Sequence, residues 1–353
     1  MAGQDHGSAL FTGLVDLAAE GLGGRVLAAS DDFFASKDNL VADAAPVFLP
    51  DEYTERGKWM DGWESRRKRT PGHDWAIVTL GVPGRIRGLD IDTAHFLGNH
   101  PPYASVEAMA VAAGTEPSAD ELGASGDWVE ILGQVPLRAG SHNFFCVGAA
   151  GDDPSRAWTH LRLNIFPDGG VARLRVYGEV VPRWDRFDPD AETAPHVADG
   201  SVDLASILGG AQALACSDMF FGPMNNLLLP GRSVNMGGGW ETRRRRGPGH
   251  DWIIVRLGAR GTVGTLELDT NHFKGNYPDR ASVEAIDAAG ARITDLVAPQ
   301  APWRPLLSET KLAAHTRHFF REELTQTGPA THLRLSIFPD GGVSRLRAWG
   351  ARA

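Results

Sequence analysis

Short runs in which apolar and polar side chains alternate recur along the whole chain. Residues 86–93 and 263–270 alternate in this way, as half-buried strands do. Residues 74–81 and 251–258 are rich in β-branched and aromatic side chains and close on Gly, which is also typical of strands. Turn residues separate such runs about every 8 to 12 positions. The pattern predicts an all-β chain of β-sandwiches, with one short helix over 10–20.

A predicted hairpin ends each half of the chain. Residues 159–166 and 331–338 alternate, and each run is followed by Pro-Asp-Gly-Gly. Gly accepts positive φ, so this sequence favours a tight turn. The returning runs, 173–178 and 345–350, alternate as well. Both halves are therefore expected to close on two paired strands.

The same order of elements occurs twice. Asp16 is matched by Asp203, 187 positions later, whereas Trp63 is matched by Trp240, 177 positions later, so the first copy carries about ten extra residues around 46–59. Extra segments of this kind normally fall in surface loops. A polar, acidic, Pro-containing stretch separates the copies. We predict a first repeat over 1–181, a linker over 182–200 and a second repeat over 201–353.

The longest repeated motif is rich in charge. It runs from Trp63 to Trp75 and again from Trp240 to Trp252. Each copy places a carboxylate, four cations, a Pro-Gly turn and a His-Asp pair between two tryptophans. Charged side chains resist burial unless they are paired. The motif is therefore either a set of structural ion pairs that specifies the fold or a site for an anionic ligand.

Composition excludes several classes of protein. The chain has 353 residues and a net charge of -9, which argues against a general nucleic-acid binder. No apolar run reaches the 18 or more residues that a membrane span needs, and the first nine residues lack the apolar core of a signal peptide. The two cysteines stand at non-equivalent places in the repeat and are expected to be reduced thiols. We therefore expect a cytoplasmic protein that binds neither nucleic acid nor a membrane.

Residues 27–34, 57–69, 72–75 and 92–93 resemble the allantoicase family. The match extends over both copies and nearly the whole chain. Each copy also resembles, more faintly, the galactose-binding or discoidin-like jelly roll, so the fold implied is two tandem jelly-roll β-sandwiches. The resemblance implies hydrolysis of allantoate to ureidoglycolate and urea in purine (allantoin) catabolism. We also expect the protein to form a homo-oligomer. The partner that it binds is expected to be this small-molecule substrate.

That reaction sets clear chemical requirements. Release of intact urea means that the bond between the central carbon of allantoate and a ureido nitrogen breaks, because attack at a ureido carbonyl would release ammonia. The leaving nitrogen needs a proton donor, and a base or a metal must activate water. The substrate carboxylate calls for a fixed cation, and the fork of Arg can bind both oxygens.

The repeated motifs contain side chains of these kinds. The predicted catalytic residues, from the His-Asp and Asp-x-x-His motifs, are His73, Asp74, Asp92, His95, His250, Asp251, Asp269 and His272. The predicted substrate-binding residues are Glu64, Arg66, Arg67, Asn99, Glu241, Arg243, Arg244 and Asn276. Structural alternatives remain for each group: ion pairing for the cations, bracing of the Pro-Gly turn for the histidines, and Gly-Asn loop geometry for the asparagines.

The sequence leaves the metal and the number of sites open. Asp92 with His95, and Asp269 with His272, offer oxygen and nitrogen donors that suit a divalent metal such as manganese, or they are hydrogen-bonded loop residues. Each repeat could hold a site, or one site could lie between repeats or subunits. The alternative function is a non-catalytic tandem jelly-roll module that binds a small anionic or carbohydrate-like ligand without turnover.

Overall fold

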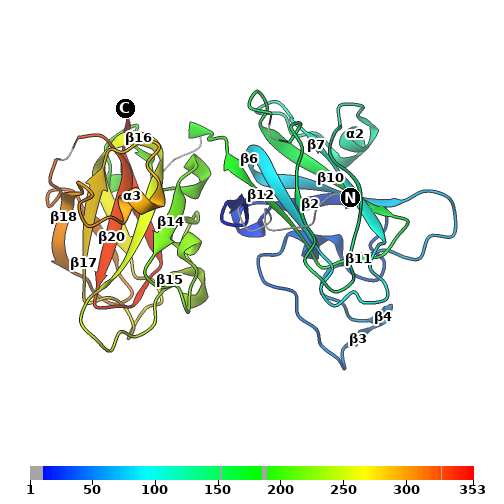
Figure 1. The fold of residues 1–353 in the computed structure, drawn as a ribbon, viewed down its shortest axis with the longest axis horizontal. Helices are drawn as coiled ribbons and strands as arrows, with labels where there is room; N and C mark the ends of the chain where they lie inside the picture. Colours follow the sequence, from blue (N-terminus) through cyan, green and yellow to red (C-terminus); the bar gives the residue numbers. More distant parts are fainter. Residues whose placement is uncertain (1–10, 152, 185–188, 327) are drawn as a thin grey trace. The chain divides into compact units, whose positions relative to one another are not determined.

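The computed structural model describes residues 11–151, 153–184, 189–326 and 328–353, which form two units, Met1–Val181 and Pro182–Ala353 (Figure 1). Each unit is built almost entirely of strands around its own apolar core. The prediction of an all-β chain of two tandem jelly-roll sandwiches is confirmed. In the described part of the chain, no helix combines the length and apolarity that crossing a membrane requires.

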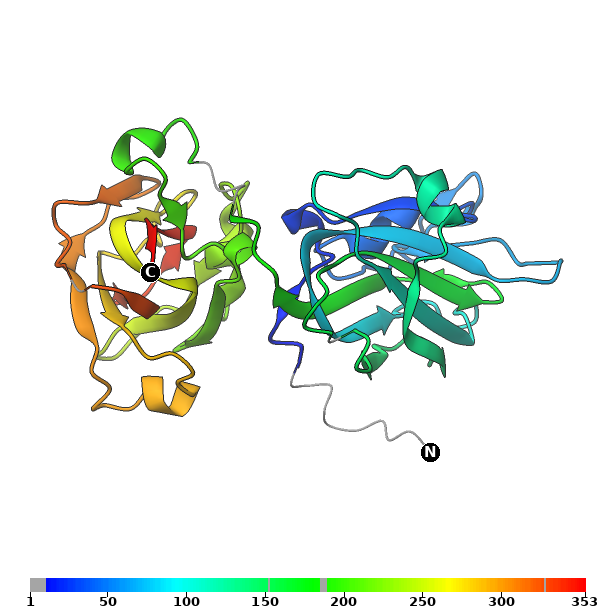
Figure 2. The ribbon, with the colours of Figure 1, turned by 90° about the horizontal axis from the view of Figure 1, so that it is seen from above.

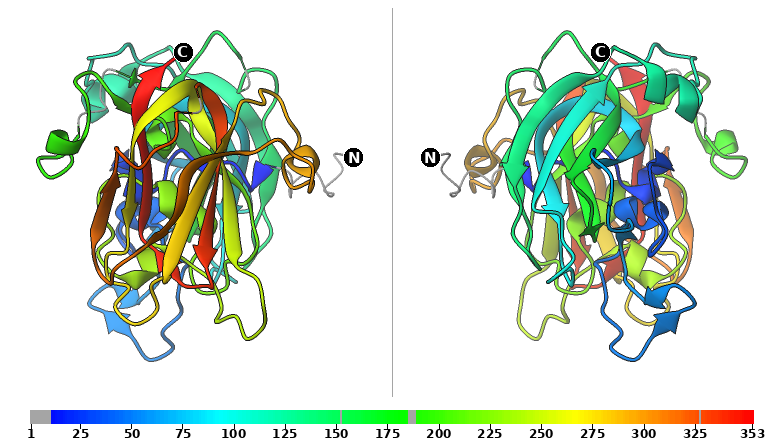
Figure 3. Two further views of the ribbon diagram at one scale, coloured as in Figure 1. Left: turned by 90° about the vertical axis from the view of Figure 1, so that its left-hand side faces the viewer. Right: turned by 90° about the vertical axis from the view of Figure 1, so that its right-hand side faces the viewer.

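The first unit holds one large sheet with strand order β1-β12-β6-β10-β7-β8, and β2 and β9 pair with β6. Figure 3 shows β6, β7 and β10 running side by side. The ten strands outside the 46–59 segment are β1 (Val15–Asp16), β2 (Arg25–Ala29), β5 (Trp63–Glu64), β6 (Asp74–Asp92), β7 (Tyr103–Met109), β8 (Val129–Pro136), β9 (Phe144–Cys146), β10 (Trp158–Phe166), β11 (Gly170–Val171) and β12 (Arg173–Val180). The extra segment of this repeat forms the hairpin β3 (Tyr53–Thr54) and β4 (Gly57–Lys58). The helical pieces are η1 (Glu20–Leu22), η2 (Lys37–Val41) and α2 (Ala119–Ala124).

The second unit repeats this topology, with strand order β13-β22-β16-β20-β17-β18 and with β14 and β19 paired to β16. Figure 2 shows its strands curling around the interior. Its strands are β13 (Val202–Asp203), β14 (Gln212–Cys216), β15 (Trp240–Glu241), β16 (Asp251–Asp269), β17 (Arg280–Ile286), β18 (Arg304–Lys311), β19 (Arg317–Phe320), β20 (Ala330–Phe338), β21 (Gly342–Val343) and β22 (Arg345–Arg352). Its helical pieces are η4 (Ala194–His196), η5 (Ile207–Gly209), η6 (Met224–Leu228), η7 (Met236–Gly238) and α3 (Ile293–Leu296).

Strand β6 joins the two layers of the first sandwich. Its first half pairs with β2 and β10, and its second half pairs with β12 and β9. Asp74 at its start donates its N–H to Pro167 O at 3.1 Å, and Asp92 at its end accepts from Ala172 N at 2.7 Å. Both ends of β6 therefore return to the same hairpin, 166–173. Its inward side chains are fully buried, whereas Asp90 and Asp92 lie on the other face of the strand.

Two close contacts fix this hairpin. Trp63 is fully buried and donates Nε1–H to Asp31 O at 2.7 Å, and β5 pairs with β11. A Cβ at Gly170 would lie 2.0 Å from the ring of Phe96, so only Gly fits there. The second repeat uses Trp240, Asp218 O and Gly342 in the same way. The motif tryptophans are therefore core residues, and the charged residues that follow them lie at the edge of the sandwich.

Two local features differ from expectation. Leu10 lies outside the described residues, and the helix predicted over 10–20 is wrong, because Val15 and Asp16 form strand β1 against β12. The Asp16 carboxylate accepts from Val176 N at 2.8 Å, a tertiary contact that outweighs local helix propensity. Of the stretch predicted as a linker, Asp190, Thr193 and His196 contact the second unit through Arg317, Thr265 and Phe319.

Candidate active site

The first half of each charged motif forms a rim at one end of its sandwich, made of Asp31, Glu64, Arg66 and Asn99 in the first repeat and of Asp218, Glu241, Arg243 and Asn276 in the second. Asn99 Nδ2 donates to Glu64 Oε1 at 2.7 Å, and Asn276 Nδ2 donates to Glu241 Oε1. Burial raises the pKa of Glu64, and the bond from Asn99 opposes this only in part. These residues, predicted 35 positions apart to bind substrate, do lie together.

The motif arginines of the rims are paired on one edge only. Arg66 Nε donates to Asp31 Oδ2 at 2.7 Å, and the backbone N–H of Arg66 donates to Asp31 Oδ1 at 2.8 Å. The guanidinium of Arg66 lies over the ring of Phe33. Arg243 repeats this fork on Asp218 and lies over Phe220. Burial alone would raise the pKa of Asp31, but the hydrogen bonds from Arg66 outweigh it and lower this pKa, so the pair is ionic. The Arg66 side chain is still 63% exposed and keeps donors for a ligand.

Two further cations of each motif, which lie between strands and not within one, differ in the direction they take. Lys68 and Arg245 turn inward and bind the buried carboxylates of Asp74 and Asp251. Arg67 and Arg244 point outward and are exposed, and no hydrogen bond or ion pair to either is found within the described ranges. Only part of each basic cluster can therefore meet one ligand, as the alternation predicted.

The predicted His-Asp pairs are not joined. Asp74 Oδ1 receives Ser30 Oγ at 2.8 Å and Lys68 Nζ at 2.6 Å, and the carboxylate is buried. His73 lies on the opposite side of the strand, with its ring 4.7 Å from that of Phe166. Consecutive residues of a strand face opposite ways, so sequence adjacency does not bring them together.

His250 and Asp251 of the second repeat are divided in the same way. The ring of His250 lies 4.7 Å from that of Phe338, and Asp251 Oδ1 accepts from Ser217 Oγ at 2.9 Å. His250 borders an open hollow of about 450 Å³ that also contains the ion pair of Arg334 with Glu284.

The predicted Asp-x-x-His pairs are separated as well. Asp92 Oδ1 accepts from Ala94 N at 2.8 Å, whereas His95 donates Nε2–H to Pro46 O at 3.2 Å and stacks on Phe48. In the second repeat, Asp269 is fully buried against Arg232, and His272 bonds to Ser233 O at 3.0 Å. His95 and His272 have φ of 70° and 69°, in the left-handed region that non-Gly residues seldom adopt.

A histidine absent from the predicted set is the true neighbour of Asp92. His142 donates Nδ1–H to Asp90 Oδ2 at 2.7 Å and lies 3.7 Å from Asp92 Oδ2 (the His142 cluster). Its ring stacks on Phe144 and its side chain is 62% exposed. Burial alone would lower the pKa of His142, but the bond and charge of Asp90, with the charge of Asp92, raise it.

The second repeat carries a different side chain at this position. Strand pairing aligns Phe144 with Asp90 in β9 and Phe319 with Glu267 in β19, so Arg317 stands where His142 does. Arg317 Nη2 contacts Glu267 Oε1 at 2.8 Å. The scaffold is shared, but only the first repeat offers a group at this position that can exchange a proton near neutral pH.

The described residues do not provide a group of metal-binding side chains that would support the predicted metal site. Among the residues that the structure describes, no group of three or more His, Cys, Asp or Glu side chains is arranged to hold a metal ion. The pairs predicted as ligands, Asp92 with His95 and Asp269 with His272, are held by other partners. We therefore derive no catalytic step through a metal.

Comparison with known proteins gives one consistent result. A family model described as the allantoicase repeat matches residues 15–181 and 202–353. A probable allantoicase of Pseudomonas aeruginosa (strain UCBPP-PA14) is 47% identical over 341 residues, which is 97% of this chain and 97% of that protein. Probable allantoicase 1 of Burkholderia mallei (strain ATCC 23344) is 48% identical over 336 residues, 95% of this chain and 94% of that protein. The crystal structure of allantoicase from Saccharomyces cerevisiae is 35% identical, covers 96% of this chain and 93% of that chain, and superposes with a TM-score of 0.78.

Proposed function

The chain belongs to the allantoicase family, and on this premise we propose that it hydrolyses allantoate to ureidoglycolate and urea, a step of allantoin degradation in purine catabolism. The observation that carries the proposal is the extent of the match, which includes both repeats and 97% of the chain at 47% identity. The small-molecule substrate follows from the same membership.

Proton transfer is assigned to His142 of the first repeat. Because Asp90 holds Nδ1–H, Nε2 is the ring nitrogen left for exchange. The raised pKa keeps a larger share of the ring protonated near neutral pH, which suits donation to the leaving ureido nitrogen. Water supplies the hydroxyl that bonds to the central carbon as the carbon–nitrogen bond breaks. The water proton returns to the ring, so allantoate and water give ureidoglycolate and urea.

Substrate binding is assigned to the rim of the first repeat. Glu64 and Asn99 of the rim pair with Gly170, and Asp92 of the His142 cluster accepts from Ala172 N, so both groups contact the hairpin 166–173. Arg66 is held on one edge by Asp31 and exposes its remaining donors, which suits the substrate carboxylate. The pair of Asn99 and Glu64 offers an amide and a carboxyl group, which match the carbonyl and N–H groups of a ureido arm.

The test is product analysis with the purified full-length protein. Allantoate should yield urea and ureidoglycolate in equal amounts, with no ammonia. Ammonia in place of urea would mean attack at a ureido carbonyl and would overturn the proposed bond cleavage. Saturable binding without any product would favour the alternative of a non-catalytic binding module. A parallel assay with a chelator decides whether the predicted manganese takes part. The cytoplasmic location and the homo-oligomer stay predictions.

A further inference from the structure

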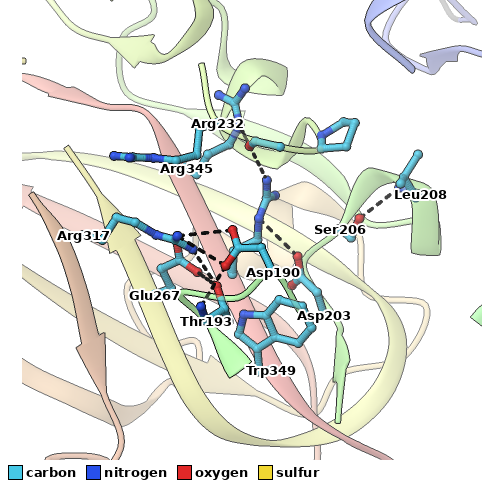
Figure 4. Close-up of a pocket in the computed structure, with 13 residues that line it drawn as sticks. Asp190, Thr193, Asp203, Ser206, Leu208, Arg232, Glu267, Arg317, Arg345 and Trp349 are labelled. Carbon is cyan, nitrogen blue, oxygen red and sulfur yellow. Dashed lines mark hydrogen bonds and ion pairs between the residues drawn. The ribbon is translucent and has the colours of Figure 1, made fainter. Parts of the chain in front are cut away.

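The second repeat contains a polar pocket that the proposed reaction does not use (Figure 4). Its volume is about 290 Å³, near the lower end of the roughly 300–1,000 Å³ typical of small-molecule sites. It lies on the outer face of β16 and β22, where Glu267, Arg345, Arg347 and Trp349 project. A ligand of the size of a small organic acid fits this volume.

On one side of the pocket, the arginines are already paired with carboxylates. Arg317 Nη1 contacts Asp190 Oδ2 at 3.2 Å, and its Nη2 contacts Glu267 Oε1 at 2.8 Å and Thr193 Oγ at 2.6 Å. Figure 4 shows these contacts converging on one guanidinium. Arg232 is likewise matched by Asp269 at 3.0 Å. Glu192 Oε2 also lies 2.9 Å from Arg317 Nη1, so the carboxylates outnumber the cations on this side and its two arginines are already engaged within the protein.

Arg345, on another side, is not neutralised. Its Nε and Nη1 donate to backbone carbonyls, those of Gly231 at 2.9 Å and Gly238 at 2.7 Å among them. No carboxylate lies within ion-pair distance of it among the described residues. Burial and then the charge of Arg347 lower the pKa of Arg345 to about 10, which leaves it charged at neutral pH. The charge of Asp269 opposes this lowering from a distance, and the neighbouring Arg347 pairs through Nε with Asp203 Oδ2 at 3.5 Å. Arg345 is therefore a buried cation that makes no direct ion pair with any described residue.

Two further donors of the pocket lack acceptors. Arg347 Nη1 and Trp349 Nε1 are buried and have no hydrogen-bond partner within the described part of the chain. Arg347 is 8% exposed and Trp349 is 7% exposed. Buried donors are nearly always paired, so these two point to an acceptor that the protein itself does not supply. Cation and donors together describe a site for an acceptor-rich anion.

The first repeat closes the same place with its own side chains. Arg173, the counterpart of Arg345, contacts Asp61 Oδ1 at 2.9 Å, whereas the residue equivalent to Asp61 is Gly238. Tyr177, the counterpart of Trp349, is packed by Phe11 with ring centroids 5.7 Å apart. The unmatched charge and donors are thus particular to the second repeat.

We propose that this pocket is a second ligand site, which binds a small carboxylate carrying a carbonyl acceptor through Arg345, Arg347 and Trp349. The substrate of the proposed reaction belongs to this chemical class, but the pocket chemistry does not depend on that reaction. The pocket binds without turnover, since Arg317, at the position of His142, cannot exchange a proton near neutral pH.

The test uses hydantoate, which has one carboxylate and one ureido group and no second ureido group to lose. Calorimetric titration of the full-length protein should show saturable binding. Gly238→Asp, which supplies the counterion found in the first repeat, should weaken this binding about tenfold or more. Trp349→Phe removes one donor without adding charge and should also weaken it, which keeps the test valid if Gly238→Asp fails to fold.

Urea release from allantoate separates the outcomes. Both pocket variants should retain it, because neither residue belongs to the proposed rim or to the His142 cluster. Unchanged hydantoate binding in both folded variants, or no saturable binding by the unmodified protein, would overturn the second site. Absence of urea release with intact, variant-sensitive hydantoate binding would instead overturn the proposed reaction alone.

Discussion

The two repeats share a scaffold and differ in what one position of it holds. In the first repeat, His142 reaches Asp90 at 2.7 Å and its proton can move, whereas in the second repeat Arg317 reaches Glu267 at 2.8 Å and stays charged. Burial raises the pKa of Asp90 and of Glu267. The neighbouring His142 and Arg317, respectively, act against this rise. One difference on a duplicated frame thus separates a position suited to proton transfer from a position occupied by a permanently charged, internally paired arginine.

The buried arginines extend this comparison. Arg173 in the first repeat has a carboxylate, Asp61, at 2.9 Å, whereas Arg345 has backbone carbonyls alone. Carbonyl dipoles solvate a guanidinium but do not cancel its charge. The buried arginine of the first repeat is therefore neutralised by its own repeat, whereas Arg345 makes no direct ion pair with the residues that the structure describes. The duplication preserved the strands and let the counterions diverge.

The largest difference between the repeats is expected for His142→Gln, which removes the proton-transfer group of the first repeat. Loss of the exchangeable proton should lower the rate of urea release by about 10²- to 10⁴-fold, the usual contribution of a general acid or base. His196→Gln is the matched control, because His196 stacks on Phe319 as His142 stacks on Phe144. Steady-state kinetics of both folded variants gives the answer. Full turnover by His142→Gln would contradict the assignment of proton transfer to His142 of the first repeat.

A second prediction concerns stability. Asp61→Ala leaves the buried Arg173 without its carboxylate and should lower the free energy of unfolding by about 3–5 kcal/mol. Guanidinium chloride denaturation followed by circular dichroism measures this change. Lys37→Ala, which loses a contact at 3.4 Å between a partly exposed lysine and the exposed Asp38, is the control and should cost less than about 1 kcal/mol. An equally small loss for Asp61→Ala would show that carbonyls suffice in the first repeat too.

A third prediction compares the two rims. Arg66→Ala should raise KM for allantoate about 10- to 100-fold, because a charge-assisted contact to the substrate carboxylate is lost. Arg243→Ala, the same change in the second repeat, should raise KM less. Initial-rate kinetics on both variants measures the ratio. Equal effects would mean that both rims bind substrate during turnover.

The smallest expected effect is on the pH dependence of stability. The folded-state pKa of His142 is raised above its ordinary value of 6.5, so its stabilising contribution is complete below that pH and is lost as pH rises through the folded pKa. The melting temperature of the unmodified protein should therefore exceed that of His142→Gln most at pH 6 and less at higher pH. The exposed ring keeps the difference modest. A difference independent of pH would contradict the pairing with Asp90.

Much of the fold is readable from the chain because it depends on local pattern. The alternation of residues 159–166 and the Pro-Asp-Gly-Gly turn predict β10, β11 and β12, and the spacing of 177 positions predicts the second copy. The spacing is 187 positions before the first-copy segment 46–59 and falls to 172 positions at the closing strands, where Thr159 is matched by Thr331. The helix over 10–20 failed because Asp16 is held by Val176, a residue 160 positions away.

The site is readable only in part. The structure brings the predicted residues Glu64 and Asn99 together, but Asp31, the partner of Arg66, was not among the predicted residues. His142 was missed because its contact with Asp90 spans 52 positions and follows from how β9 pairs with β6. Alternation states which residues share a face, but it does not state which strands pair or in what register. Residues 141–145 and 316–320 share only the Phe-Phe pair and a hydroxyl residue, at a spacing of 175 that differs from the 177 of the charged motif.

Strands β6 and β16 are each 19 residues long. Because side chains alternate with a period of two, one residue inserted or deleted before Asp90 would turn the acidic pair into the apolar interior and send Leu89 and Ile91 out to water. Such a lesion would disable chemistry and folding together. When these repeats are recombined or redesigned, the length of β6 and β16 must therefore be kept, because a change of one residue moves every following side chain to the other face of the strand.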